Sequence, residues 1–255
     1  MTNYAIVTGA SAGLGKEFAK LAAADGYGVV LVARRKDELE SLSRELGVPS
    51  LVHPMDLSDP ATPKELFDKL SALGVTVDVL VNNAGLGSNG QFWELDERRE
   101  MGMIQVNVTA LVHLTRLFLP GMIQRGRGHV LNIGSTAGYQ PGPYMTTYYA
   151  SKAFVNSFTE GLAFELRGTG VTATLSCPGA TATEFSSRAG NDKSRLFQMG
   201  GVADSATVAR EAWAAMKAKR RTIVHGLKNK AGVHALRVSP KSTAIAIAAR
   251  LNRGT

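Results

Sequence analysis

Short apolar runs alternate with longer amphipathic stretches along most of the chain. The short runs are rich in β-branched residues and have no polar face, which is typical of strands buried on both sides of a parallel sheet. Strands are therefore expected at residues 5–7, 28–33, 51–52, 77–81, 129–133 and 171–177. The stretches between them repeat apolar residues at helical spacing, and helices are expected at residues 15–24, 36–46, 62–73, 97–124 and 148–166.

This order of strands and helices predicts an α/β fold, in which helices cover both faces of a doubly wound parallel sheet. No linker rich in Pro, Gly or Ser divides the chain, so one domain is expected over residues 1–255, with its core in about 1–204. The C-terminal segment, about 205–255, is expected to be helical, with helices near 227–237 and 241–251.

Basic residues are concentrated toward the C-terminal end. Residues 206–255 contain 11 Lys or Arg and one acidic residue, whereas residues 1–205 contain 18 basic and 20 acidic residues. A solvated helical face accounts for such a segment, and so does a surface that meets an anionic membrane, an acidic protein or a nucleic acid. We expect no nucleic-acid partner, and contact with a membrane surface stays open.

The residue types exclude several classes of site. The chain has one cysteine, Cys177, so it forms no internal disulfide and no thiolate zinc cluster. The five histidines lack the spacing of metal ligands, so no metal site is expected. No apolar run reaches the ~20 residues of a membrane-spanning helix, and a strand-like run begins before a signal peptide could fit. We expect a cytoplasmic protein.

A glycine-rich turn follows the first predicted strand and opens the first predicted helix. It reads Thr8-Gly9-Ala10-Ser11-Ala12-Gly13-Leu14-Gly15. Glycines permit a tight turn and a close approach of the backbone to a pyrophosphate, while a helix N-terminus offers free N–H groups and a partial positive charge. The turn therefore predicts a nucleotide-phosphate site, with a glycine spacing that differs from the common Gly-x-Gly-x-x-Gly.

Five further motifs follow this turn along the chain. They are Asn82-Asn83-Ala84-Gly85, then Asn107, Ser135, Tyr148 with Lys152, and Pro178-Gly179 with Thr183. In order and spacing they resemble the short-chain dehydrogenase/reductase family over residues 4 to about 185, and the last 50 residues match it only loosely. The resemblance implies a Rossmann-type fold and an oxidoreductase that uses a nicotinamide coenzyme to interconvert a carbonyl group and an alcohol.

Tyr148 and Lys152 lie four residues apart and therefore share one face of a helix. An ammonium group beside a phenol favours the phenolate, so Lys152 is expected to lower the pKa of Tyr148 from about 10 and fit it for proton transfer. Ser135 is expected to donate a hydrogen bond to the substrate oxygen. The resemblance implies that Lys152 also binds the nicotinamide ribose, and that Asn107 bends its helix and holds a water beside Lys152. Tyr149 is expected to take no part in the chemistry.

The end of the second predicted strand indicates which coenzyme is expected. NAD-binding members carry an acidic residue there, which binds the ribose 2′-OH, whereas this chain has Ala33 followed by Arg34, Arg35 and Lys36. These three bases attract a 2′-phosphate, which an arginine can bind with two hydrogen bonds, and Ser11 offers a hydroxyl beside them. NADP(H) is therefore expected over NAD(H), although Ala12 stands where many NADP-preferring members carry a second base. The alternative for the arginines is a surface cluster at a helix start.

The resemblance extends to the rest of the coenzyme site, where Asp56 and Leu57 resemble the pair that contacts adenine. The complete set of expected coenzyme contacts is Gly9, Ser11, Gly13, Leu14, Gly15, Arg34, Arg35, Asp56, Leu57, Asn83, Ala84, Gly85, Tyr148, Lys152, Pro178, Gly179 and Thr183. The expected catalytic set is Asn107, Ser135, Tyr148 and Lys152.

Aromatic and apolar residues flank these motifs in residues 139–145 and at Phe185, Phe197 and Met199, so an apolar or aromatic ketone, aldehyde or alcohol is the expected substrate. The irregular segment 186–202 is expected to open and close over it. The basic tail is expected to cover the cleft or a neighbouring subunit of a homodimer or homotetramer. Two alternatives stay open: a non-catalytic NADP-binding sensor on the same fold, and a peripheral membrane protein that acts through its tail.

Overall fold

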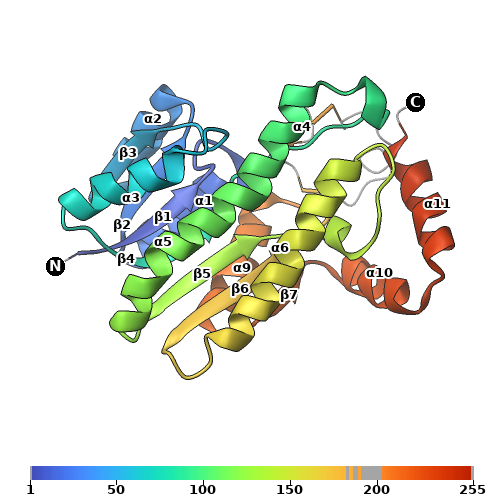
Figure 1. Cartoon of the computed structure of the whole chain (residues 1–255). Coiled ribbons are helices and arrows are strands. Elements are labelled where there is room, and N and C mark those ends of the chain that lie inside the picture. Colours follow the sequence, from blue (N-terminus) through green and yellow to red (C-terminus); the bar gives the residue numbers. More distant parts are fainter. Residues whose placement is uncertain (1, 182–183, 186–188, 191–202, 254–255) are drawn as a thin grey trace.

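A sheet of seven parallel strands lies between two layers of helices (Figure 1). The structure is a computed structural model that describes residues 2–181, 184–185, 189–190 and 203–253. In these residues the strand order is β3-β2-β1-β4-β5-β6-β7, so the sheet winds outward from β1 in both directions. The strands are β1 (Asn3–Thr8), β2 (Gly28–Ala33), β3 (Ser50–Pro54), β4 (Thr76–Asn82), β5 (Gly128–Ile133), β6 (Val171–Cys177) and β7 (Thr222–Val224).

The two helical layers bury separate apolar clusters against the sheet. Because side chains alternate along a strand, Ile6 of β1 faces one cluster, whereas Ala5 and Val7 face the other. The first cluster lies under α3 (Thr62–Ala72), α5 (Leu111–Gln124) and α6 (Thr146–Glu165). The second lies under α1 (Gly13–Ala24), α2 (Lys36–Leu46) and α9 (Ser205–Lys217). The predicted doubly wound, Rossmann-type α/β fold is confirmed.

The helix predicted over residues 97–124 is present, but its geometry is not uniform. It runs through α4 (Glu97–Ile104), a π-helical stretch η2 (Gln105–Ala110) and α5. By length and composition this helix could cross a membrane, which the apolar runs alone do not suggest. Leu114, Phe118 and Met122 are buried against the sheet, so the helix forms part of the core of the domain.

Strand β7 lies outside the predicted elements, because three partly buried residues give no periodic signal. His225 follows β7 and joins it to two other elements. Its Nε2 lies 2.9 Å from the hydroxyl of Ser176 in β6, and its Nδ1 lies 2.7 Å from a carboxylate oxygen of Glu211 in α9. Ser176 is fully buried, so this Ser–His–Glu chain is closed to a substrate and its role is to fix the end of the sheet.

The tail forms two helices, α10 (Leu227–Val238) and α11 (Lys241–Asn252), each one residue longer than predicted. They lie beyond the end of the sheet and not on its faces (Figure 1). Helix α10 packs on the turn after β6, where the amide of Asn229 leaves no room for a side chain at Gly179. This position brings the tail next to the turns that carry the predicted site.

Three buried or half-buried histidines make the stability of this fold depend on pH. Burial lowers the pKa of His53, His129 and His225, and for His225 the Glu211 carboxylate acts in the opposite direction. In the unfolded chain these histidines become protonated near pH 6.5, whereas in the folded chain they become protonated only at lower pH. The free energy of unfolding therefore falls as the pH drops from about 7 to about 5. We expect the Tm at about pH 5.5 to lie a few degrees below that at about pH 7.5, measured by circular dichroism. A Tm that stays constant or rises toward pH 5.5 would contradict this.

Candidate active site

A cavity of about 1240 Å³ lies along the carboxyl ends of the central strands. In an open parallel sheet, this edge is where ligands bind, at the point where the strand order reverses. Ser135 lines the cavity, whereas Gly15 and Asn107 lie outside its wall, and Thr183 is outside the described residues. The residues of the expected coenzyme set that line it are Gly9, Ser11, Gly13, Leu14, Arg34, Arg35, Asp56, Leu57, Asn83, Ala84, Gly85, Tyr148, Lys152, Pro178 and Gly179.

The glycine-rich turn has a backbone that requires its glycines. Gly9 has a φ of +66° and Gly13 a φ of +52°, values that L-residues with side chains rarely adopt. Helix α1 begins at Gly13, and its N-cap residue, Ala12, makes no side-chain hydrogen bond to the first turn. The N-terminal N–H groups of α1 therefore face the cavity without a side-chain cap, an arrangement that suits an anion.

The hydroxyl of Thr8 ties this turn to the next strand of the sheet. It donates a hydrogen bond to the carbonyl of Val81 at 3.1 Å and accepts from the N–H groups of Asn83 and Ala84 at 2.9 and 3.0 Å. In return, the side-chain amide of Asn83 donates to the carbonyl of Thr8 at 2.9 Å. These bonds fix the turns after β1 and β4 against each other, so the predicted phosphate loop and the Asn-Asn-Ala-Gly motif form one wall.

Two arginines stand at one end of the cavity. The guanidinium of Arg35 donates to the backbone carbonyl of Ser11 at 3.2 Å and to its hydroxyl, and it forms an ion pair with Glu184 at 3.1 Å. Arg34 lies 3.9 Å from the carboxylate of Asp56. Glu184 was not singled out from the sequence, because the pairing joins residues that are far apart along the chain. A phosphate bound here would compete with Glu184 for Arg35.

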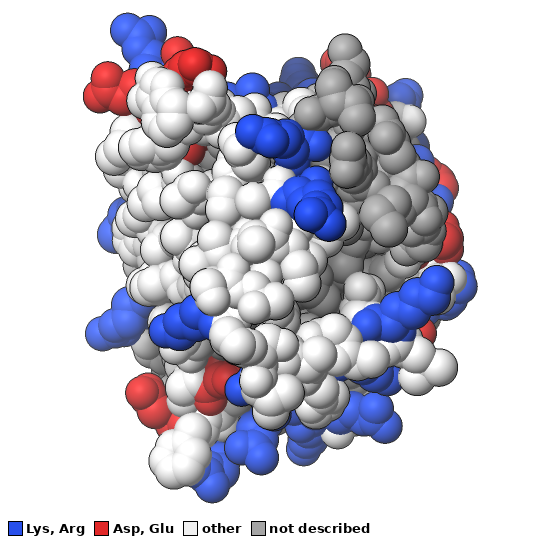
Figure 2. Space-filling view, turned by 90° about the vertical axis from the view of Figure 1, so that its right-hand side faces the viewer, with Lys and Arg blue, Asp and Glu red and all other residues white. Residues whose placement is uncertain are grey.

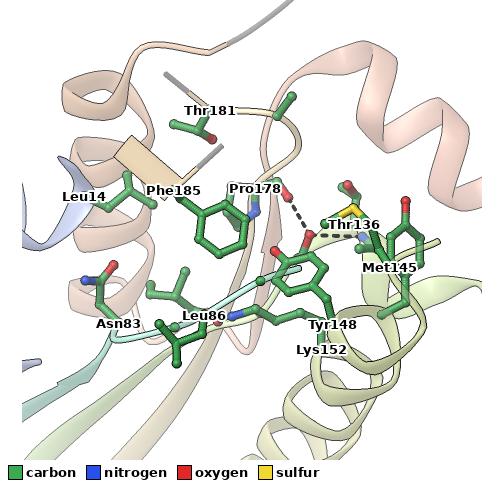
Figure 3. A pocket seen from close by; sticks show the side chains of 18 of the residues that line it. Leu14, Asn83, Leu86, Thr136, Met145, Tyr148, Lys152, Pro178, Thr181 and Phe185 are labelled. Carbon is green, nitrogen blue, oxygen red and sulfur yellow. Dashed lines mark hydrogen bonds between the residues drawn. The ribbon is translucent and has the colours of Figure 1, made fainter. Parts of the chain in front are cut away.

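Tyr148 and Lys152 project from α6 into the middle of the cavity (Figure 3). Lys152 is buried, its ammonium donates to the carbonyl of Ile133 at 2.8 Å, and it lies 5.8 Å from the centre of the Tyr148 ring. The Ser135 hydroxyl donates to the carbonyl of Pro178 at 3.4 Å and accepts from the N–H of Ala137 at 3.0 Å. The helical spacing brings Tyr148 and Lys152 together, and Ser135, from the turn after β5, lines the same cavity.

The expected effect of Lys152 on Tyr148 is not what the structure shows. Burial raises the pKa of Tyr148 to about 12, and the neighbouring Ser135 hydroxyl opposes this rise only in part. Burial also lowers the pKa of Lys152 to about 8. The prediction of a lowered phenol pKa is therefore wrong, because removal from water disfavours both charged groups. At neutral pH, Tyr148 is a neutral phenol that can donate a proton.

Asn107 links the turn after β4 to α6. Its side-chain amide accepts from the N–H of Leu86 at 2.8 Å and donates to the carbonyl of Leu86 and to the hydroxyl of Ser151, both at 3.0 Å. Ser151 in turn donates to the carbonyl of Tyr148 at 2.7 Å. Asn107 lies in the π-helical stretch η2, where the resemblance implies a bent helix. The water beside Lys152 stays a prediction.

The other end of the cavity is formed by the tail. The sequence left three places for the tail: over the cleft, against another subunit or on an anionic membrane surface. Residues of both tail helices line the cavity, and the other two places stay predictions. Lys and Arg side chains of the molecule surround a largely uncharged area on the face that includes the tail helices (Figure 2). The apolar residues of α10 and α11 that line the cavity are Val233, Ala235, Leu236, Ala244, Ile247 and Leu251.

Some predicted residues lie elsewhere or outside the described chain. Tyr149 does not point at the reaction centre, because its hydroxyl donates to the side chain of Asn252 at 3.1 Å. Phe185 contacts Tyr148, with ring centres 5.2 Å apart. Phe197 and Met199 are outside the described residues, as is most of the segment 186–202. Among the described residues, no group of three His, Cys, Asp or Glu is placed to hold a metal.

Comparison with known proteins agrees with this geometry. A family model described as short chain dehydrogenase matches residues 3–194. An NADP-dependent 3-hydroxy acid dehydrogenase of Salmonella typhi is 40% identical over 71% of this chain and 74% of its own length. A short-chain dehydrogenase from Sphingobium yanoikuyae, solved in complex with NADPH, is 31% identical over 92% of both chains, with a TM-score of 0.83. A 7beta-hydroxysteroid dehydrogenase structure is 27% identical over 96% of both chains, with a TM-score of 0.86.

The fold and the residues at its carboxyl edge are those of a nucleotide-binding oxidoreductase. More narrowly, the chain belongs to the short chain dehydrogenase family, since the family model covers most of its length and a relative is 40% identical to it. The resemblance in the sequence motifs is confirmed.

Gly15 offers a test of how tightly the phosphate loop is packed. A Cβ added there would collide with the carbonyl of Gly9 and lie 2.7 Å from the side-chain nitrogen of Asn83. We expect Gly15→Ala to lower the free energy of unfolding by about 1–3 kcal/mol, because the turn must shift. Gly161 in α6 is the matched control, because a Cβ there meets nothing within 4 Å, and Gly161→Ala should raise stability by up to about 1 kcal/mol. Urea denaturation measures both, and equal effects would refute the account of the turn.

Proposed function

We propose that the protein is an NADP(H)-dependent oxidoreductase that interconverts a ketone or aldehyde and an alcohol. The observation that carries the proposal is the position of Ser135, Tyr148 and Lys152, which line a cavity with a cationic phosphate end and an apolar end. A catalytic trio between a coenzyme end and a substrate end is the arrangement that hydride transfer requires.

The cavity wall fits a dinucleotide. A Cβ at Gly9 would lie 2.9 Å from the Asn83 amide and 3.0 Å from Ala84, so the glycine lets the phosphate loop pack directly on the turn after β4. A Cβ at Gly85 would lie 3.7 Å from the ammonium of Lys152, so a ribose beside Gly85 would reach Lys152. When bound, the nicotinamide supplies or accepts a hydride.

The side chains of this protein handle the proton. In the reducing direction Tyr148 donates its phenolic proton to the substrate oxygen, because its pKa of about 12 keeps it protonated at neutral pH. The Ser135 hydroxyl donates a hydrogen bond to the same oxygen and stabilises the negative charge that develops there. The positive form of Lys152 then stabilises the tyrosinate that remains.

The arginines at the phosphate end support NADP(H) as the coenzyme. A guanidinium binds a 2′-phosphate with two charge-assisted hydrogen bonds, and the Ser11 hydroxyl beside Arg35 adds a further donor. β2 ends at Ala33, so the ribose meets no carboxylate at this position. The Salmonella typhi relative is named as NADP-dependent and the Sphingobium yanoikuyae structure contains NADPH, which supports the same coenzyme here.

The other end supports an apolar substrate. Met145, Phe185 and the tail residues line that part of the cavity, and apolar walls with few polar groups select apolar ligands. A substrate that also carries a carboxylate is the second candidate, since Arg98 and Lys228 line the same cavity and a relative is named as a 3-hydroxy acid dehydrogenase. The two candidates are separated by a substrate panel in which each apolar ketone is compared with the 3-oxo acid of similar size. The compound with the higher kcat/KM identifies the preferred class.

Removal of one hydroxyl tests the proton donor. Tyr148→Phe keeps the ring and should leave the fold intact, but kcat for ketone reduction should fall by about 10²–10⁴-fold because the acid is lost. Tyr149→Phe removes the neighbouring hydroxyl and should keep kcat within a few-fold. Steady-state oxidation of NADPH measures both. The assignment fails if Tyr148→Phe turns over at the wild-type rate.

Charge removal at the phosphate end tests the coenzyme. Arg34→Ala with Arg35→Ala should weaken NADPH binding by about 100-fold, given about 1.5–3 kcal/mol for each charge-assisted hydrogen bond, and leave NADH binding within a few-fold. Lys36→Ala is the control, because Lys36 pairs with Glu40 and does not line the cavity. Fluorescence titration gives the dissociation constants of the wild type and both variants for each coenzyme, and equal wild-type affinity for NADPH and NADH would contradict the proposal.

A further inference from the structure

The last residue of α11 is fastened to the active-site region by three hydrogen bonds. Asn252 has no solvent exposure. Its side-chain oxygen accepts from the Tyr149 hydroxyl at 3.1 Å, and its side-chain nitrogen donates to the carbonyl of Pro143 at 3.0 Å. Its backbone carbonyl accepts from the side chain of Asn89 at 2.9 Å. A buried amide thus has both ends of its side chain satisfied.

The three partners belong to the segments that build the site. Tyr149 adjoins Tyr148 on α6, Pro143 lies in the turn that precedes α6, and Asn89 follows β4. The Tyr149 ring is itself fixed, because it is buried and packs so closely on Gly142 that a side chain there would collide with it. Asn252 therefore joins the tail to a rigid part of the molecule.

The rest of α11 gives little packing to hold it in place. Apart from Asn252, the residues that it buries are Ala244 and Ala248, which have small side chains. Ile247 is more than half exposed, yet it lines the cavity together with Leu251. The position of this apolar wall thus depends on polar contacts at the end of the helix more than on apolar burial.

We propose that Asn252 and Tyr149 are positioning residues that hold α11 as the wall for the far end of a bulky substrate. The inference rests on the proposed function, which places the reacting carbonyl at Tyr148. A bulky ketone reaches Ile247 and Leu251 and depends on their position, whereas a small ketone contacts only the surroundings of Tyr148. Loss of the Tyr149–Asn252 bond should therefore weaken binding of bulky substrates selectively.

Tyr149→Phe tests this with the ring retained. KM for a bulky aromatic ketone should rise about tenfold, whereas KM for a small aliphatic ketone, kcat and the affinity for NADPH should stay within about twofold. Asn252→Ala should change the KM ratio in the same direction, and the double variant should add little, because either change breaks the same bond. Tyr4→Phe is the control, because Tyr4 lies at the amino end of β1, away from the cavity. It should leave the ratio of the two KM values unchanged. A loss of stability alone would not change the ratio of the two KM values.

Two measurements keep this test separate from the proposed function. Hydrogen exchange should be faster across residues 241–252 in Tyr149→Phe than in the wild type and unchanged in β5. Calorimetric titration of the bulky ketone into the NADPH-loaded protein gives its affinity without turnover. If the wild type binds the bulky ketone but does not reduce it, the proposed function is wrong. The positioning role would still be tested by comparing the ketone affinity of Tyr149→Phe with that of the wild type. If Tyr149→Phe has the same ratio of KM values for the two ketones as the wild type, the inference is wrong, whatever the hydrogen-exchange rates of residues 241–252.

Discussion

The burial of a positively charged group, the Lys152 ammonium, is the constraint on which the arrangement of this site depends. The ammonium of Lys152 is removed from water, and its hydrogen bond to the carbonyl of Ile133, at the end of β5, compensates part of that loss. The turn after β5 must therefore lie directly against α6. The amide of Asn156 donates to the carbonyl of Ser135 at 3.1 Å, and Gly138 has no room for a side chain against the Lys152 backbone. These contacts set the position of Ser135 relative to Tyr148.

The same burial sets the protonation state from which the site starts. A phenol and an amine in one dry pocket both favour their neutral forms, so Tyr148 is protonated and Lys152 is near its point of ionisation at neutral pH. A site prepared in this way donates a proton first and accommodates the resulting charge afterwards. The proposed reduction of a carbonyl uses this order of events.

The two ends of the cavity differ in how they are held. The phosphate end is part of the core, because the Thr8 hydroxyl ties the turns after β1 and β4 together through hydrogen bonds to backbone groups. The apolar end consists of a helical tail whose attachment depends on a few side chains, Asn252 foremost. The coenzyme end is thus rigid, whereas the substrate end can change by substitution of a few residues without disturbing the sheet.

The sequence predicted those parts of the site that depend on local spacing. Tyr148 and Lys152 share a helical face, and the glycine turn lies between β1 and α1, so both could be found from periodicity. Burial, in contrast, depends on the whole fold, which explains the wrong direction for the pKa of Tyr148. Partners far apart along the chain were also missed. Tyr149 meets Asn252 across 103 residues, and Arg35 meets Glu184 across 149 residues, and no local pattern connects either pair.

The most direct test of the account is the consumption of NADPH by the wild-type protein with a panel of apolar ketones and aldehydes, followed together with the appearance of the alcohol. We predict that at least one bulky ketone is reduced, with one alcohol formed for each NADPH consumed. If NADPH is bound tightly but none is consumed with any carbonyl compound of the panel, the site is a sensor and not a catalyst, and the account of Tyr148 as a proton donor is wrong.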